Sequence, residues 1–291
     1  MPRKQKFQAV ALSVRIPDDK ERDYSSLLTA ILSQRKSVEV FRGTGMALTS
    51  FNPKSGNGTI SKFSIIDLEG EWFDESGFGP ANEKDIEKNS IPANLRPNLI
   101  SKPIRLNSED HIIIVMNYSA GKSVSPTQVE KYFRAILSLP PIMEEFGAVQ
   151  IDLYKDSDEI DEMLKIETLK EIKITVSRPN HFDKDLAKEI EEAHKDEKAD
   201  EITRTIKTKD NEYLEPGART LAFGYLAAEN GNVAVQYDDA GATVASTSQS
   251  RPLIKTEMTD DPESTEEGIF AKISRFLIDA VRANRRNFLS S

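Results

Sequence analysis

The segment Ser119-Ala-Gly-Lys-Ser could do chemistry, because it follows a hydrophobic run as the end of a phosphate-binding loop would. Such a loop needs a glycine five residues before Gly121, where this chain has Met116. It also needs a helix that begins at the Lys-Ser pair, so that its amides face the phosphates. We therefore interpret the segment as a glycine-containing connection between a strand and a helix, with Lys122 exposed.

An acidic run between Asp152 and Glu162 could form a cation site. Calcium loops need a glycine at the bend, and this run contains none. Negative charge is favourable at the first turn of a helix, and a solvated helix start explains the run better. The carboxylates of Asp161 and Glu171, together with Lys173, could form a site that holds Mg²⁺ and activates water. A metal-dependent nuclease is therefore one alternative function.

Histidine and cysteine are scarce: the 291 residues include no cysteine and only His111, His181 and His194. No histidine has a second one at the spacing that metal sites use. We therefore expect no metal, no cofactor and no enzymatic activity. The Arg178–His181 loop could place Arg178 and Asn180 against a phosphate at the start of the following helix.

Charge is unevenly distributed along the chain. Residues 1–62 hold 11 Lys and Arg against 5 Asp and Glu, although the whole chain has a net charge of −9. Basic residues spread over several elements are typical of proteins that contact a phosphate backbone without reading sequence. The candidate nucleic-acid-binding residues are Arg3, Lys4, Lys6, Arg35, Lys36, Arg42, Arg178, Arg282, Arg285 and Arg286.

The elements that must position these residues alternate between strand and helix patterns, which predicts an α+β fold (mixed α/β) of two lobes. We expect largely antiparallel or mixed sheets with packed helices. Phe7–Ile16 alternates as a half-buried strand does, and a helix follows near residues 27–32. Ser125–Leu137 begins like a helix, with Ser125 as N-cap, Pro126 at the first position and Gln128 closing a capping box.

The second half of the chain predicts the strand Leu169–Val176 and a charged helix over Asp183–Ile206. The pattern that follows predicts a hairpin of two strands, Thr220–Ala228 and Asn232–Tyr237. Glu263–Phe288 predicts a closing helix. Its expected buried stripe comprises Ile269, Ile273, Phe276, Leu277, Ala280 and Val281.

Two lobes are predicted, an N-terminal one over residues 1–142 with a basic start, and a C-terminal one over residues 143–291 that ends in the amphipathic helix. Residues 70–110 are rich in glycine and proline and predict a long excursion or hinge. The longest apolar run, Ile112–Met116, is far too short to cross a bilayer, and the N-terminus lacks a signal-peptide core. We therefore expect a cytoplasmic protein.

The sequence also resembles two known groups of proteins. Ile91–Leu99, the strand His111–Tyr118 and the segment that opens Ser125-Pro-Thr-Gln look like an uncharacterised bacterial family associated with phage defence and mobile elements. The order of elements from Leu169 onward is similar to that of the phage lambda exclusion protein Rex A. The second resemblance implies a homodimer that binds DNA without sequence specificity in an abortive-infection system.

These observations predict a non-enzymatic homodimer that binds the phosphate backbone of nucleic acid. We expect it to act in a phage-defence or mobile-element system. An alternative is a sensor or regulator of a partner effector protein. That function would use the acidic stretch Glu144–Glu215, where 22 acids face 12 bases. The metal-dependent nuclease is the third hypothesis.

Overall fold

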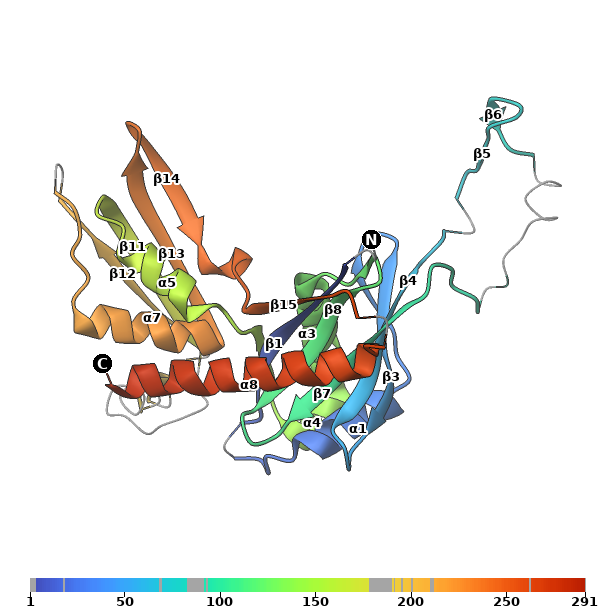
Figure 1. The fold of residues 1–291 in the computed structure, drawn as a ribbon, viewed down its shortest axis with the longest axis horizontal. Coiled ribbons are helices and arrows are strands. Elements are labelled where there is room, and N and C mark those ends of the chain that lie inside the picture. The colour runs from blue at the N-terminus through green and yellow to red at the C-terminus, as the bar shows by residue number, and fades with distance from the viewer. Residues whose placement is uncertain are drawn as a thin grey trace.

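The computed structural model describes residues 4–17, 19–67, 70–82, 92, 94–177, 190, 192–194, 196–199, 201–209, 212–261 and 263–290. Within them the chain forms two large antiparallel sheets with packed helices, and a long helix closes it (Figure 1). These features confirm the predicted α+β fold.

The first sheet runs in the order β10-β1-β8-β7-β4-β3-β2, with β15 also paired to β1 and β9 paired to β8. Its strands are β1 (Gln5–Arg15), β2 (Val38–Phe41), β3 (Thr44–Asn52), β4 (Asn57–Ser64), β7 (Ile100–Asn107), β8 (Ile112–Ser119), β9 (Lys122–Ser123), β10 (Gln150–Leu153) and β15 (Ile254–Thr259).

Strand β1 is buried on both faces, whereas its sequence predicts one half-buried face. Val10, Leu12 and Val14 join the core beneath the N-terminal helices, and the small residues Ala9 and Ala11 face the closing helix α8 (Glu266–Ser290). Strand β8 is likewise buried on both faces. Together they form the centre of the sheet, because a helix layer covers each side.

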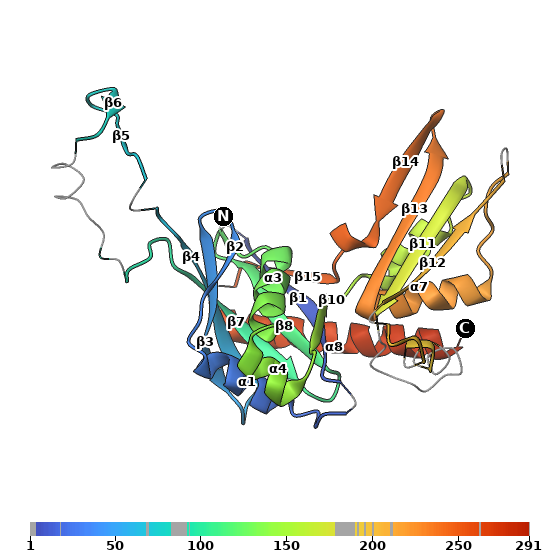
Figure 2. The same cartoon turned by 180° about the vertical axis from the view of Figure 1, so that it is seen from behind.

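Helices α1 (Tyr24–Ser33), α3 (Pro126–Leu137) and α4 (Pro140–Phe146) cover one face of this sheet, and α8 covers the other (Figures 1 and 2). Helix α3 begins where the sequence predicts, after Ser125. The expected capping box is wrong in one respect, since the Ser125 side chain caps no backbone amide. Its Oγ lies 2.8 Å from the Thr127 Oγ1 instead.

The second sheet has the order β12-β11-β13-β14 and is covered on one face by α5 (Ser157–Leu164) and α7 (Ala218–Asn230). Its strands are β11 (Leu169–Ser177), β12 (Glu201–Lys207), β13 (Gly231–Asp239) and β14 (Ala242–Thr247), and a short 3₁₀ turn, η1 (Ser248–Ser250), follows β14.

Two sequence predictions in this sheet are wrong. Strand β12 replaces the end of the expected charged helix, because its β-branched residues suit an edge strand and Ile202 pairs with Val176 of β11. The expected strand Thr220–Ala228 is part of helix α7. Its buried residues Phe223 and Ala227 are spaced four apart and pack on the sheet, which overrides the local strand pattern.

The predicted boundary at residues 142/143 differs from the arrangement of the sheets. Strands β10 and β15 come from the C-terminal half, yet both pair with β1 in the first sheet. Helix α8 contacts β1, β8 and β15 and also reaches α7 below the second sheet (Figure 1). The reason is that the backbone N–H and C=O groups along one edge of β1 form their hydrogen bonds with these two late strands.

Helix α8 buries Ile269, Ile273, Leu277 and Val281 against the first sheet, as its sequence predicts. Phe276 is a correction to the expected stripe: it is 46% exposed, and the Lys255 ammonium lies 3.8 Å from the centre of its ring. Among the described residues, no helix combines the length and apolarity needed to cross a membrane.

An arm leaves the first sheet between β4 and β7 and carries a small hairpin, β5 (Phe73–Asp74) and β6 (Gly79–Pro80), away from both sheets (Figures 1 and 2). Phe73 is 60% exposed and Phe78 is 85% exposed. Their rings meet edge to face at 5.6 Å. The predicted 70–110 excursion is therefore shorter than expected, because Ile100–Asn107 forms β7 of the first sheet, and the described part of the arm carries an exposed aromatic pair.

The burial along α8 predicts unequal effects of two neighbouring substitutions. Leu277→Ala should lower the free energy of unfolding by about 2–5 kcal/mol, because it leaves a cavity in a fully buried site. Phe276→Ala should lower it by about 1 kcal/mol or less, since it removes a half-exposed ring and its cation contact. Urea unfolding followed by circular dichroism measures both losses, and equal losses would contradict the assignment of faces.

Candidate functional site

Two of the C-terminal arginines predicted to bind nucleic acid are held in ion pairs. Arg282 Nε lies 3.0 and 2.9 Å from the two carboxylate oxygens of Asp110, in the turn between β7 and β8. Arg285 Nη2 donates to Glu229 of α7 at 2.7 Å, and its Nη1 lies 3.4 Å from Asp110. These pairs tie α8 to the β7–β8 turn and to α7, and the two guanidinium groups already have carboxylate partners.

The Arg285 pair is shielded from water. The side chains of Arg285 and Glu229 are 14% and 10% exposed, and that of Asp110 is 8% exposed. Burial alone would lower the pKa of Arg285, but the neighbouring Glu229 and Asp110 carboxylates outweigh it and raise the pKa. The guanidinium therefore stays charged, and its role in the structure is to join α7, α8 and the first sheet.

The other predicted binding residues divide into two groups. Arg3 and the Arg178–His181 loop lie outside the described residues, as does the side chain of Arg286. The remaining five are all exposed: Lys4, Lys6, Arg35, Lys36 and Arg42.

Strand register gathers basic residues at one end of the first sheet. The start of β1 pairs with the end of β8, with Gln8 opposite Tyr118, and the Lys6 ammonium lies 5.6 Å from the Tyr118 ring centre. Lys122 follows in β9, opposite Ser119. The N-terminal arm and the glycine-lysine segment therefore meet in space.

The same end continues across the sheet. Lys62 in β4 donates from Nζ to the carbonyl of Ser123 at 2.5 Å. The β2–β3 turn that carries Arg42 lies beside the end of β4, where Thr44 pairs with Ser64. We call this set the basic end: Lys4, Lys6, Arg42, Lys62, Lys102 and Lys122.

Lys102 forms the floor of the basic end and is only 3% exposed. Its Nζ donates to the Ser119 carbonyl at 3.2 Å and also contacts the Ser119 Oγ, which in turn donates to Glu266 at 3.1 Å. Burial lowers the pKa of Lys102, while Glu266 acts in the opposite direction. The sequence did not single out this lysine, although its alternation with the core residues Ile104 and Leu106 is a signal for burial.

The glycine-lysine segment is a hairpin turn rather than a phosphate loop. Ala120 and Gly121 have φ values of 49° and 75°, which turn β8 directly into β9. The two carboxylates of the nuclease hypothesis have different partners, since Asp161 pairs with Lys165 and Glu171 pairs with Lys207. No group of three or more histidine, aspartate or glutamate side chains could hold a metal ion within the described part of the chain.

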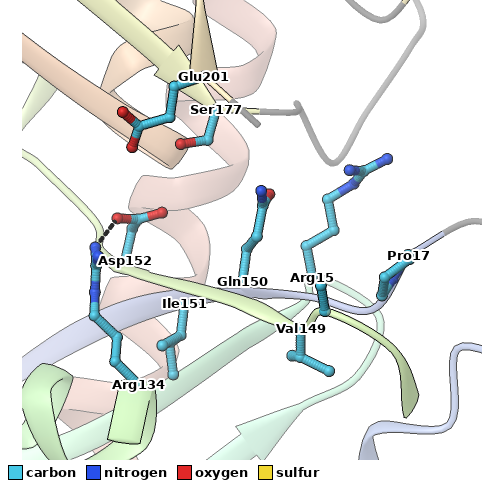
Figure 3. Close-up of a pocket in the computed structure, with 10 residues that line it drawn as sticks. Arg15, Pro17, Arg134, Val149, Gln150, Ile151, Asp152, Ser177 and Glu201 are labelled. Carbon is cyan, nitrogen blue, oxygen red and sulfur yellow. Dashed lines mark hydrogen bonds and ion pairs between the residues drawn. The ribbon is translucent and has the colours of Figure 1, made fainter. Parts of the chain in front are cut away.

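A second polar region lies where the two sheets meet, and we call it the interlobe cleft. Its outer cavity has a volume of about 530 Å³, and Figure 3 shows Ser177 and Glu201 of the second sheet across from Arg15, Gln150 and Asp152 of the first. The lining comprises Arg15, Pro17, Arg134, Ala148, Val149, Gln150, Ile151, Asp152, Ser177 and Glu201.

An inner cavity of about 130 Å³ adjoins the outer one and shares Arg134, Asp152, Ser177 and Glu201 with it. Gly231 forms part of its wall, where a Cβ would lie 2.1 Å from the carbonyl oxygen of Thr175. Only glycine can occupy position 231, because any side chain there would clash with the backbone of β11. The cavity is therefore built by strand packing as well as by side chains.

Charged side chains line the inner cavity, and two of them, Asp152 and Lys155, are buried. Arg134 bonds to both Glu130 and Asp152, at 3.0 and 2.5 Å. Burial raises the pKa of Asp152, against the effect of Lys155 and Arg134. Burial lowers the pKa of Lys155, and Asp152 and Glu130 oppose that change. The sequence did not reveal this set, because its acidic run indicates only a helix start, a role that Asp156 does fill at α5.

The Arg285 network predicts a structural effect without a binding effect. Arg285→Ala should lower the free energy of unfolding by about 3 kcal/mol, because it leaves Glu229 and Asp110 short of a partner. Arg275→Ala, on the exposed side of the same helix, should change it by about 0.5 kcal/mol or less. Urea unfolding measures the difference. Loss of duplex DNA binding in a stable Arg285→Ala protein would contradict this role.

The comparisons with known proteins concern the chain as a whole. Comparison with curated proteins gives no match. A family model described as a domain of unknown function, DUF4747, matches residues 3–275. This match spans both sheets, the basic end and the interlobe cleft, and the chain therefore belongs to the DUF4747 family.

Proposed function

We propose that this protein binds the phosphate backbone of nucleic acid, without sequence preference, through the basic end of its first sheet. The observation that carries the proposal is the convergence of cationic side chains from β1, β4, β7, β9 and the β2–β3 turn at one sheet end. Each lysine or arginine there can neutralise a backbone phosphate, and such contacts carry no sequence information.

The separation of acidic residues from the basic end supports binding of nucleic acid in one orientation. Most of the described acids between Glu144 and Glu215 lie on α5, on the strands of the second sheet or in the segments next to them. A polyanion approaching this molecule is repelled there and attracted at the basic end, and such fields steer association. Glu266 lies beside Lys102 and limits the local positive charge. We therefore expect modest affinity that depends strongly on salt.

The biological setting is part of the same proposal. A cytoplasmic homodimer in a phage-defence or mobile-element system rests on the resemblances of Ile91–Leu99 and of the C-terminal element order. A dimer would place two basic ends on one nucleic acid, which increases the effective affinity of weak backbone contacts.

A second candidate function is regulation of a partner effector, and the aromatic arm favours it. Phe73 and Phe78 form an exposed pair at the end of the hairpin, away from both sheets. Large exposed apolar groups mark protein-interaction sites more often than single exposed residues do. A nuclease-treated pulldown from infected host cells separates the two functions, because partner capture would survive nucleic-acid removal only in the second.

If the basic end binds DNA, substitutions in it should reduce the salt dependence of DNA binding. Arg42→Ala combined with Lys122→Ala should weaken binding to unrelated duplexes equally and reduce the slope of log affinity against log salt by about 2, because each lost contact removes about one released counterion. Fluorescence anisotropy in a salt series measures the slope.

The matched control is Lys54→Ala combined with Lys131→Ala, which removes the same charge from exposed positions away from the basic end. Lys54 lies in the β3–β4 turn at the opposite end of the sheet. The binding curve of this control should overlay that of the unchanged protein. Equal loss in the two double variants would assign binding to net charge alone and contradict the proposed surface.

A further inference from the structure

The inner cavity of the interlobe cleft contains a buried cation without a direct partner. Lys155 is 3% exposed and lines the cavity. In the part of the chain that the structure describes, its ammonium makes no hydrogen bond and no ion pair, although Asp152 and Glu130 lie within electrostatic reach. Because the Lys155 side chain lines the cavity and no carboxylate of the described residues lies within bonding distance of its ammonium, an anionic group bound there would supply its acceptor.

Hydrogen-bond acceptors without a donor among the described residues lie across the same cleft. The Glu201 carboxylate lines both cavities, and it makes no ion pair or side-chain hydrogen bond to the described residues. The Gln150 Oε1 atom is buried in the outer cavity and has no hydrogen-bond partner among them. The cleft therefore presents a donor from the β10 side and an acceptor from β12, on opposite sheets.

The charges of the lining exclude a strongly charged ligand. Three cations, Arg15, Arg134 and Lys155, stand against three carboxylates, Glu130, Asp152 and Glu201. A lone anion beside Lys155 would leave the Glu201 carboxylate without a cation, and a lone cation beside Glu201 would leave the Lys155 ammonium without an acceptor. A molecule that carries one charge of each sign pairs with both walls and leaves the total charge at zero.

We propose that the interlobe cleft binds a free α-amino acid as its zwitterion, with the carboxylate toward Lys155 and the ammonium toward Glu201. The inner cavity of about 130 Å³ suits this small charged head group. The outer cavity of about 530 Å³, with Val149 and Ile151 in its wall, receives the side chain. Ligand sites commonly combine such a volume with a few convergent polar groups.

The test uses the full chain and the twenty L-amino acids, each added singly to a thermal unfolding assay. At least one should raise the unfolding midpoint, because a ligand that binds only the folded state stabilises it. Isothermal titration should then give that amino acid at least about tenfold higher affinity than the matched amine without the carboxylate, or the matched acid without the amine. No shift with any of the twenty overturns the proposal.

Two variants test the orientation of the ligand. Glu201→Gln should weaken amino-acid binding about tenfold and leave the matched acid unaffected. Lys155→Met should weaken it similarly and leave the matched amine unaffected. Glu201 lies on an edge strand and is exposed, so its substitution keeps the fold even where the Lys155 variant does not.

The control is Glu215→Gln, an exposed glutamate outside both cavities, which should bind as the unchanged protein does. Equal affinities for Glu201→Gln and Glu215→Gln overturn the proposed site. Equal affinities of the unchanged protein for the amino acid and its matched amine overturn the zwitterion as the ligand class.

Discussion

The rest of the structure depends on the burial of β1 on both faces and its pairing along both edges. One edge pairs with β8, and the other is shared by β10 and β15. Because Ala9 and Ala11 are small, α8 can lie close against this strand while Val10 and Leu12 fill the opposite core. A backbone strand left with one unpaired edge in such a buried position would carry a large desolvation cost. The late segments of the chain therefore have to return to β1.

This return explains why the second sheet is placed where it is. The chain leaves the first sheet after β10, builds α5, the second sheet and α7, and comes back as β15 and α8. The seam between the sheets is consequently formed by β10 on one side and by β11 and β12 on the other. The interlobe cleft lies at that seam, and its charged residues come from both bodies. A binding site there would couple the two lobes, since a ligand would contact both.

Charge has two different uses in this protein. Around Asp110, Arg282 and Arg285 satisfy carboxylates and hold α8 to the lobes, where burial makes a lost partner costly. At the basic end, most cations are exposed, whereas Lys62 and Lys102 donate to backbone carbonyls and Glu266 is a nearby acid. Exposed cations remain able to bind phosphate groups. A cation in an ion pair that is shielded from water is already occupied by its carboxylate. Position in the fold, rather than residue type, separates the two uses.

The sequence by itself determined the α+β class, the start of α3 at Pro126, the strand Leu169–Val176 and the apolar stripe of α8 around Leu277. These follow from local periodicity and from the preference of proline for the first position of a helix. It did not determine β12 or α7, whose packing overrides local preference. The partners of Arg285, the convergence of Lys6, Lys62 and Lys122, and the burial of Lys155 were decided only by the tertiary structure. Each depends on strand register or on contact between residues far apart in the chain, and a local sequence pattern carries no information about either.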